Sequence, residues 1–537
     1  MTNIKVIHVE REKAEAKLLR EQEQRRTWGR MNAQSKANQN LGFSIARLNH
    51  TEIAFFFKKA TTILQNPKIK AKKKAAILIL FVSFWTGRAV EDVVLFKIIR
   101  RLQTSPAHEG IYLLGGELFW ILHVPGPDVL GVRLTDQSPA CKVKRYIQLK
   151  IPYTFKDLIM PHVKSMMTNE NHNNLFDVDL LHNQTLFSNV LSSIKDERNK
   201  RLNLTRIADF LFWELAHHPS SDFATALLVV GAKSSHKISQ PYYTTLGENW
   251  LQAIYGNVCD VLEAKLELKV EPSLIREYTR VKTLPEPDVY LGSPFRPKRS
   301  AVKSLIRDLQ GEIQGFLDKK NWSLEDIMRF QKPYVLYNWL MYGFSSGARP
   351  IVRPRLYPNR INLANGLAVI SDKDKDGREN TRKVWLWDEM CDQIKKYNEH
   401  IEVLYDRIGC NVPSLIELFK RHGSRNAAGH LFFINNNYKL EFITPGWIEE
   451  VLKNNYNYDM PARSHRHYIR SNLLERKCPV ETIDAFMGHA KLGQEPWTQY
   501  SAFYQADLVD SLKKHLMPQL QEDGWRALPG LTKEKRR

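Results

Sequence analysis

The sequence predicts a mainly α-helical protein with small β-sheet elements, in the α+β class. Apolar segments with helical spacing recur along the chain, and the longest run, residues 75–85, predicts a buried helix. Short β-prone runs flank a polar turn in residues 366–387, which predicts a hairpin or a small sheet. The 537 residues exceed what one hydrophobic core usually supports, so we expect two main domains with flanking segments.

Composition places the chain among globular proteins and indicates its kind of partner. Apolar residues make up 43% and aromatic residues 10%, which excludes the disordered and fibrous classes. Lys and Arg number 79 against 58 Asp and Glu, for a formal charge of +21. A charge of this size favours a polyanionic partner, either nucleic acid or an anionic membrane surface.

Several features predict a protein of the cytoplasm. The run at residues 75–85 is too short to cross a bilayer, and the first residues lack the apolar stretch of a secretory signal. The five cysteines are scattered and show no C-x-x-C spacing, which argues against both a disulfide framework and a zinc site. We therefore expect reduced, structural cysteines.

Changes in composition divide the chain into five segments. Residues 1–40 are dense in Lys, Arg, Glu and Gln, which indicates a basic helical arm that grips DNA or a solvated tail. Residues 286–300 are rich in Pro and charge without a helical period, which predicts a linker. It separates a first domain at 41–285 from a second at 301–515, and residues 516–537 form a basic tail.

The second half reads in order as helices, a hairpin and more helices. Helices are expected from about 301 to 345 and from about 388 to 510, on either side of the hairpin at 366–387. Similar stretches in the first half suggest an internal repeat, with chance pairing of apolar helices as the alternative. The matching pairs, 261, 260 and 258 residues apart, are Arg88 with Arg349, Arg206 with Arg466, and Tyr242 with Tyr500.

Polar residues gather near the expected ends of helices in the second half. Arg349 follows a Gly turn, Arg463 and Arg466 open a helix, and His489 follows a Gly, with Tyr500 further on. Guanidiniums stabilise the charge of a pentacoordinate phosphorus, while a phenol supplies a nucleophile and a lysine supplies a proton. This set suits attack on a phosphodiester without a metal.

With these motifs, residues 301 to about 510 resemble the catalytic domain of the tyrosine recombinase (phage integrase) family. The stretch "YGFSSGARP" matches the family's first box and contains Arg349. A second box, His-x-x-Arg, is followed in the family by a Gly-His about twenty residues later and then by the tyrosine nucleophile. Counting back from Gly488 and His489 places the second-box arginine at Arg466.

The resemblance implies a role for each matched residue. Arg349 and Arg466 clamp the scissile phosphate, and His489 bonds a phosphate oxygen or positions the nucleophile. Tyr500 is the expected nucleophile, and Tyr504 is the alternative.

A lysine on the hairpin turn is the general acid in this family. We favour Lys373, which directly follows the β-prone run, over Lys375 and Lys383 in the same loop.

The sequence also departs from the family pattern. Arg463 stands where the family usually has a histidine, so no general base is assigned at that place. The alternative role for Arg463 is to bind the scissile phosphate. His465 and His467 lie beside it and are expected to be ordinary polar or core-edge histidines. An acidic residue usually follows the first-box arginine by three places, but this chain has Val352 there.

The first half keeps the repeat's two arginines and its tyrosine but has Asn203 and Ala232 in place of the box histidines. It is either a degenerate copy that provides DNA grip and protein contacts or an unrelated helical module.

As a member of this family the protein would be a site-specific recombinase of the integrase or transposase type, of the kind found on mobile genetic elements. Such enzymes cut and rejoin double-stranded DNA through a 3′-phosphotyrosine intermediate, as a dimer to tetramer on DNA, with no cofactor, metal or ATP. The location would then be the cytoplasm, at the nucleoid, with no membrane partner. The alternatives are a non-catalytic DNA-binding or architectural protein and, less favoured, a type IB topoisomerase.

Overall fold

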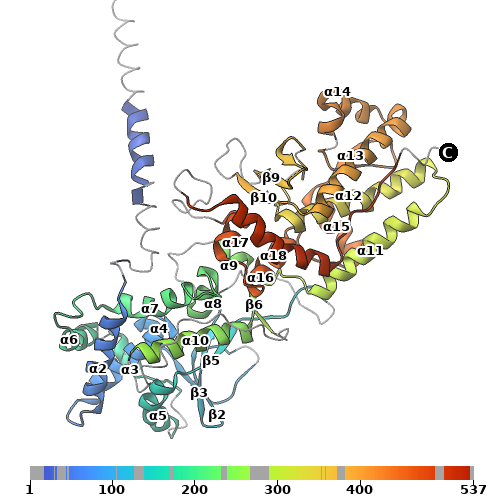
Figure 1. The fold of residues 1–537 in the computed structure, drawn as a ribbon. Coiled ribbons are helices and arrows are strands. Elements are labelled where there is room, and N and C mark those ends of the chain that lie inside the picture. Colours follow the sequence, from blue (N-terminus) through green and yellow to red (C-terminus); the bar gives the residue numbers. More distant parts are fainter. Residues whose placement is uncertain are drawn as a thin grey trace, which may run out of the picture.

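The computed structural model confirms a mainly helical chain with small sheets, as expected from the sequence (Figure 1). A first half, coloured blue to green, and a second half, coloured yellow to red, meet near α9, α16 and α17. The structure describes residues 17–29, 31–32, 44, 47–103, 106–125, 138–168, 173–182, 184–231, 239–266, 289–351, 354–356, 358–371, 381–427, 429–489 and 501–532.

Helices of the first half pack around α3, the apolar run predicted to be a buried helix. Every residue of this helix from Ala76 to Thr86 is buried, as a helix that is apolar on all sides requires. It packs against α7, which in turn packs against α8. The helices are α2 (His50–Gln65), α3 (Ala71–Thr86), α4 (Val90–Val94), α5 (Tyr153–Met167), α6 (Gln184–Ile194), α7 (Leu204–Ala216), α8 (Phe223–Val230), α9 (Ser239–Tyr243), α10 (Glu248–Lys265) and the 3₁₀ helix η1 (Val178–His182).

Two sheets accompany these helices. The larger has the order β1-β2-β3-β5, with β1 parallel to β2 and the other pairs antiparallel, and the smaller has the order β4-β7-β6. In the larger sheet Trp120 pairs with Ile111 on one side and Leu149 on the other, and all three are buried. The strands are β1 (Lys97–Ile99), β2 (Gly110–Leu114), β3 (Glu117–His123), β4 (Val143–Lys144), β5 (Tyr146–Lys150), β6 (Thr245–Gly247) and β7 (Tyr290–Gly292).

The second half contains the expected helices and the expected hairpin. Strands β9 and β10 pair antiparallel, with β8 as a third strand, and a further hairpin of β11 and β12 interrupts the second group of helices. The helices are α11 (Arg299–Leu317), α12 (Leu324–Ser346), α13 (Asp388–Ile408), α14 (Pro413–Ala427), α15 (Pro445–Tyr456), α16 (Ser464–Glu475), α17 (Val480–Met487), α18 (Gln505–Asp523) and the 3₁₀ helices η3 (Pro358–Arg360) and η4 (Gly409–Asn411). The strands are β8 (Ile361–Asn362), β9 (Leu367–Ile370), β10 (Arg382–Trp385), β11 (Phe432–Ile434) and β12 (Leu440–Phe442).

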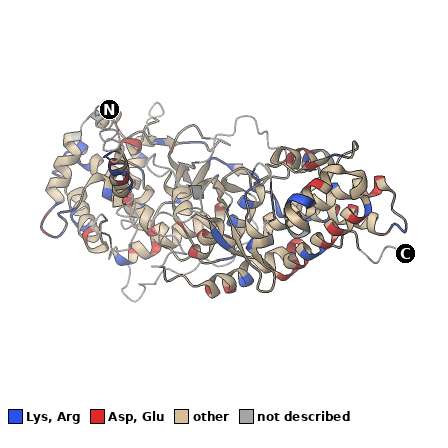
Figure 2. Cartoon of the chain, turned by 90° about the horizontal axis from the view of Figure 1, so that it is seen from above, with Lys and Arg blue, Asp and Glu red and all other residues tan. Residues whose placement is uncertain are grey.

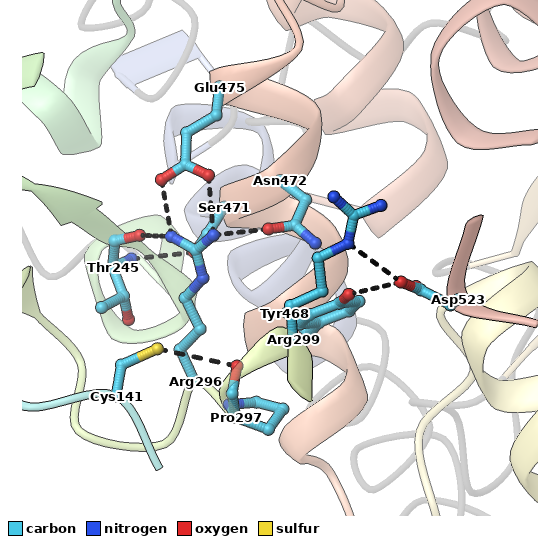
Figure 3. A network of polar contacts seen from close by, with 10 residues as sticks. All are labelled: Cys141, Thr245, Arg296, Pro297, Arg299, Tyr468, Ser471, Asn472, Glu475 and Asp523. Atoms are coloured by element: carbon cyan, nitrogen blue, oxygen red, sulfur yellow. Dashed lines mark hydrogen bonds and ion pairs between the residues drawn. The ribbon is translucent and has the colours of Figure 1, made fainter. Parts of the chain in front are cut away.

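The described part of the expected linker, 289–300, differs from the prediction because it is an ordered joint. Its strand β7 lies between β4 and β6, and Leu291 is fully buried. Figure 3 shows how the next residues attach to the second half: Arg296 donates to both oxygens of Glu475, at 2.7 Å each, and to the carbonyl of Thr245. A buried arginine whose two terminal nitrogens bond to both halves in this way fixes the halves to each other.

The C-terminal boundary also lies elsewhere than expected. Helix α18 runs through residue 515, and the following segment packs onto α12 and α13. Leu528 donates from its backbone to Gln393 at 2.7 Å and accepts from the Tyr334 hydroxyl at 3.1 Å. Apolar Trp525, Leu528 and Leu531 are buried, so this part of the tail belongs to the core.

Charged residues of both signs occur along both halves of the described chain. Figure 2 shows basic and acidic residues interspersed over both halves. In the expected arm, residues 17–29 are helical and exposed along their whole length. None of the described helices combines the length and the apolar character that crossing a membrane requires.

Candidate phosphate site at the junction of the two halves

Two helix ends meet at the site predicted from sequence. Helix α12 ends at Gly347 and α17 ends at Gly488, and each glycine has left-handed backbone angles, with φ of 61° and 65°. Such angles are readily adopted by glycine and close a helix sharply. A Cβ at Gly347 would lie 3.3 Å from Phe486 and 3.4 Å from the Met487 sulfur, so the two ends are packed against each other.

Arg466 joins the two helix ends. Its guanidinium donates to the carbonyl of Gly347, and to the carbonyl of Met487 at 2.8 Å. Its Nη2 also lies 3.2 Å from Nε2 of His489. The last carbonyls of a helix lack partners within the helix and carry partial negative charge, so a buried guanidinium is a favourable cap. The side chain is fully buried.

A second buried arginine, Arg382 on β10, joins the same two segments. Its Nη1 donates to the carbonyl of Ser346 at 3.0 Å and to the carbonyl of Phe486, and its Nη2 donates to the carbonyl of Gly347 at 2.9 Å. Thus the Gly347 carbonyl accepts from two guanidiniums. Arg382 was not predicted as a site residue, because no local pattern in the sequence marks it.

His489 lies between two arginines. While Nε2 faces Arg466, Nδ1 lies 3.4 Å from Arg470, whose guanidinium also pairs with Asp222 of the first half and, at 3.0 Å, with Asp484. A guanidinium only donates, and a neutral imidazole has one acceptor nitrogen, so His489 can accept a hydrogen bond from only one of these two arginines. The backbone N–H of His489 donates to the carbonyl of Asp484 at 2.9 Å, which fixes the residue at the end of α17.

Arg466 and His489 are in contact, and the chain leads from the Gly347 carbonyl beside them to Arg349. Arg349 is half-buried and follows, by two residues, the Gly347 carbonyl that accepts from Arg466. Arg463, in contrast, is exposed at the start of α16, and its guanidinium lies 5.1 Å from the centre of the Tyr242 ring. The predicted arginines therefore share a neighbourhood but differ in exposure.

The remaining predicted residues are placed only in part. Lys373, Lys375 and Tyr500 lie outside the described residues. The rival nucleophile Tyr504 is 68% exposed at the start of α18. Lys383 lies on β10, not in the turn, and its ammonium is 3.5 Å from the side-chain oxygen of Gln505, the residue that follows Tyr504. The hairpin thus brings one of its lysines to the residue that follows the alternative tyrosine.

The neighbouring histidines support the fold. The imidazole of His465 lies 2.7 Å from the carbonyl oxygen of Ala348, between Gly347 and Arg349, and 3.1 Å from that of Ala462. Burial lowers the pKa of His465 to about 4, so the imidazole is neutral at pH 7. His467 is also buried, and its Nδ1 lies 2.9 Å from the hydroxyl of Ser293.

No protein-family model, no curated protein and no solved structure matches the chain. Within the described residues no group of three or more His, Cys, Asp and Glu side chains is placed to hold a metal ion.

Proposed function

We propose that the protein is a site-specific DNA recombinase that cuts and rejoins duplex DNA through a tyrosine. The observation that carries this proposal is the direct contact of Arg466 with His489, 23 residues apart, beside the turn that leads to Arg349. The same three residues match the family boxes in the sequence. A net charge of +21 suits double-stranded DNA as the partner.

The proposed reaction divides the work among these residues. Arg349 and Arg466 donate to the non-bridging oxygens of the scissile phosphate, and Arg463 assists at the exposed side. The Tyr500 hydroxyl releases its proton to solvent and attacks phosphorus, so that a 3′-phosphotyrosine bond forms as the bond to the 5′ oxygen breaks. A lysine of the hairpin, Lys373 or Lys383, protonates the leaving oxygen. Rejoining reverses these steps.

The first half is proposed to be a degenerate copy of the second. Helix α3 ends at Gly87 with φ of 69° and packs against α7, just as α12 ends at Gly347 and packs against α16. Helix α8 follows α7 and ends at Gly231, as α17 follows α16 and ends at Gly488.

The arginines of the first half serve other partners. Arg88 pairs with Glu109 at 2.6 Å, and Arg206 donates to the carbonyl of Arg201 at 2.8 Å. Ala232 lies outside the described residues. In the proposed copy these two arginines therefore no longer bind a phosphate.

A suicide substrate tests the proposal. Nicked duplexes made from the DNA that flanks the gene are incubated with the protein, and a covalent protein-DNA adduct is sought by denaturing electrophoresis. We expect an adduct that is lost in Tyr500→Phe but kept in the matched variant Tyr504→Phe, with DNA binding intact in both. Arg466→Lys should slow adduct formation by at least a hundredfold, since one preorganised donor contributes about 3–4 kcal/mol to a transition state. A wild-type protein that binds these duplexes but never forms an adduct contradicts the proposal.

One observation favours a second function, a non-catalytic DNA-binding or architectural protein. Arg466 is fully buried and donates to two backbone carbonyls, which is what a purely structural arginine would do. In that case binding is salt-sensitive and no adduct forms under any condition. With either function the protein would be a homo-oligomer that binds DNA at the nucleoid. Formation of the covalent protein-DNA adduct therefore distinguishes the recombinase from the non-catalytic DNA-binding protein.

A further inference from the structure

Two tyrosines of the first half cover the candidate site. The Tyr243 ring lies 4.9 Å from the guanidinium carbon of Arg466 and is stacked on His489, with ring centres 5.3 Å apart and an angle of 22°. The neighbouring Tyr242 lies 5.1 Å from the guanidinium carbon of Arg463. Three of the six residues predicted to handle the phosphate therefore contact this pair.

The residues that follow the pair attach it to α16. The Thr244 hydroxyl accepts from Nε of Arg470 at 3.0 Å, and the Thr245 backbone donates to the hydroxyl of Ser471 at 2.9 Å. Thr244 and Thr245 are fully buried and also bond to Ser293, so the five-residue helix α9 is anchored by the residues after its C-terminal end, where Tyr243 keeps 8% of its surface exposed. A short element held in this way can be displaced without unfolding either half.

On the proposed function, a bound phosphodiester and the tyrosine pair would compete for the same face of the arginines. Cation–π contacts and phosphate contacts use the same cation, and the phosphate offers it full negative charge. We propose that Tyr242 and Tyr243 form an autoinhibitory contact that occupies the phosphate site in the free protein and that DNA displaces. The inference rests on the proposed function, because it takes the scissile phosphate of DNA as the competitor.

Neither tyrosine is suited to be the nucleophile in this arrangement. Burial raises the pKa of Tyr242, in spite of nearby Arg463, so its phenolate is disfavoured. Tyr243 lies with its ring, not an oxygen lone pair, toward the imidazole of His489. Their contribution is to fill the site.

Accessibility of Arg466 tests the contact without any need for catalysis. Phenylglyoxal modification, mapped by mass spectrometry, is compared in wild type, Tyr242→Ala/Tyr243→Ala, and the matched control Tyr242→Phe/Tyr243→Phe, which keeps both rings. We expect roughly tenfold faster modification of Arg466 in the alanine variant, in keeping with the loss of its cation–π contact with Tyr243, and an unchanged rate in the phenylalanine variant. Equal rates in all three variants overturn the inference.

Hydrogen exchange then asks whether DNA displaces the pair. Duplex DNA that the protein binds should raise exchange in residues 239–245 in wild type, and unchanged protection there under saturating DNA contradicts displacement. This readout needs no cleavage, so it stays decisive if no adduct ever forms and the proposed function fails. Where adducts do form, the alanine variant should form them roughly tenfold faster at subsaturating DNA. Loss of the adduct in the phenylalanine variant would instead make one of these tyrosines the nucleophile and overturn the inference.

Discussion

Replacing Arg382 by methionine should loosen the pair of helix ends on which the site is built. The guanidinium donates to the carbonyls of Ser346 and Phe486, both in the last turn of a helix, where no helical partner is available. The third acceptor, the Gly347 carbonyl, keeps its bond from Arg466. Two buried carbonyls then lose their donor at about 1–3 kcal/mol each, so the variant should lose about 2–6 kcal/mol of unfolding free energy.

Urea denaturation followed by tryptophan fluorescence measures this loss, with hydrogen exchange in residues 480–489 as a local readout. The matched control is Lys383→Met, which makes the same kind of change at the next, exposed position of β10 and should stay within about 0.5 kcal/mol of wild type. A free energy for Arg382→Met within about 1 kcal/mol of wild type would refute the idea that this arginine caps α12 and α17.

Three further outcomes are expected. The pKa of His465, lowered by burial to about 4, is below its unfolded value of about 6.5, so the unfolded chain binds the extra proton. Lowering the pH from 7.5 to 5 should therefore cost about 2 kcal/mol from His465 alone, beside the shares of His400 and His467, whose pKa values burial also lowers. His465→Asn should remove its own share of about 2 kcal/mol in denaturation curves; an unchanged dependence contradicts it. Asp222→Asn removes a carboxylate from the buried Arg470 and should lower the free energy of unfolding in urea by about 3–5 kcal/mol. Asp484→Asn should lower it clearly less, because the Asp484 side chain is 21% exposed. Equal losses in the two variants would show that the two halves are not joined by the pair of Arg470 and Asp222. Finally, the logarithm of DNA affinity should fall linearly with the logarithm of salt concentration, and Arg463→Ala should reduce that slope by about one; an unaltered slope would place Arg463 away from the phosphates.

Local patterns predicted those elements whose signal is continuous in sequence. The apolar run of α3 and the β-prone runs of β9 and β10 identified a buried helix and a hairpin. The hairpin of β11 and β12 was missed, although "LFFINNNYKLEF" has aromatic runs on either side of an Asn-rich turn. Strand β7 could not be predicted, because its three residues pair with β4 and β6, and both of these strands lie far from β7 in the sequence.

Contacts between segments that are distant in the sequence also limited the prediction of the site. The spacing of Arg466 and His489 reflects two consecutive helices, so their contact was predictable from the family pattern. Arg382 and Arg470 act through carbonyls and carboxylates from distant segments, among them Asp222, 248 residues away from Arg470. Tyr243 was missed for the same reason, since its place over Arg466 depends on how the halves pack.

The side chain that becomes bonded to DNA is the most direct test of the proposed function. Peptide mapping of the trapped adduct by mass spectrometry measures this, with the protein digested after denaturation and the nucleotide-bearing peptide sequenced. We predict a nucleotide on Tyr500, in a protein whose Arg466 and His489 are both required for the adduct to form. A nucleotide on another residue, or DNA bound tightly with no modified peptide at all, would contradict it.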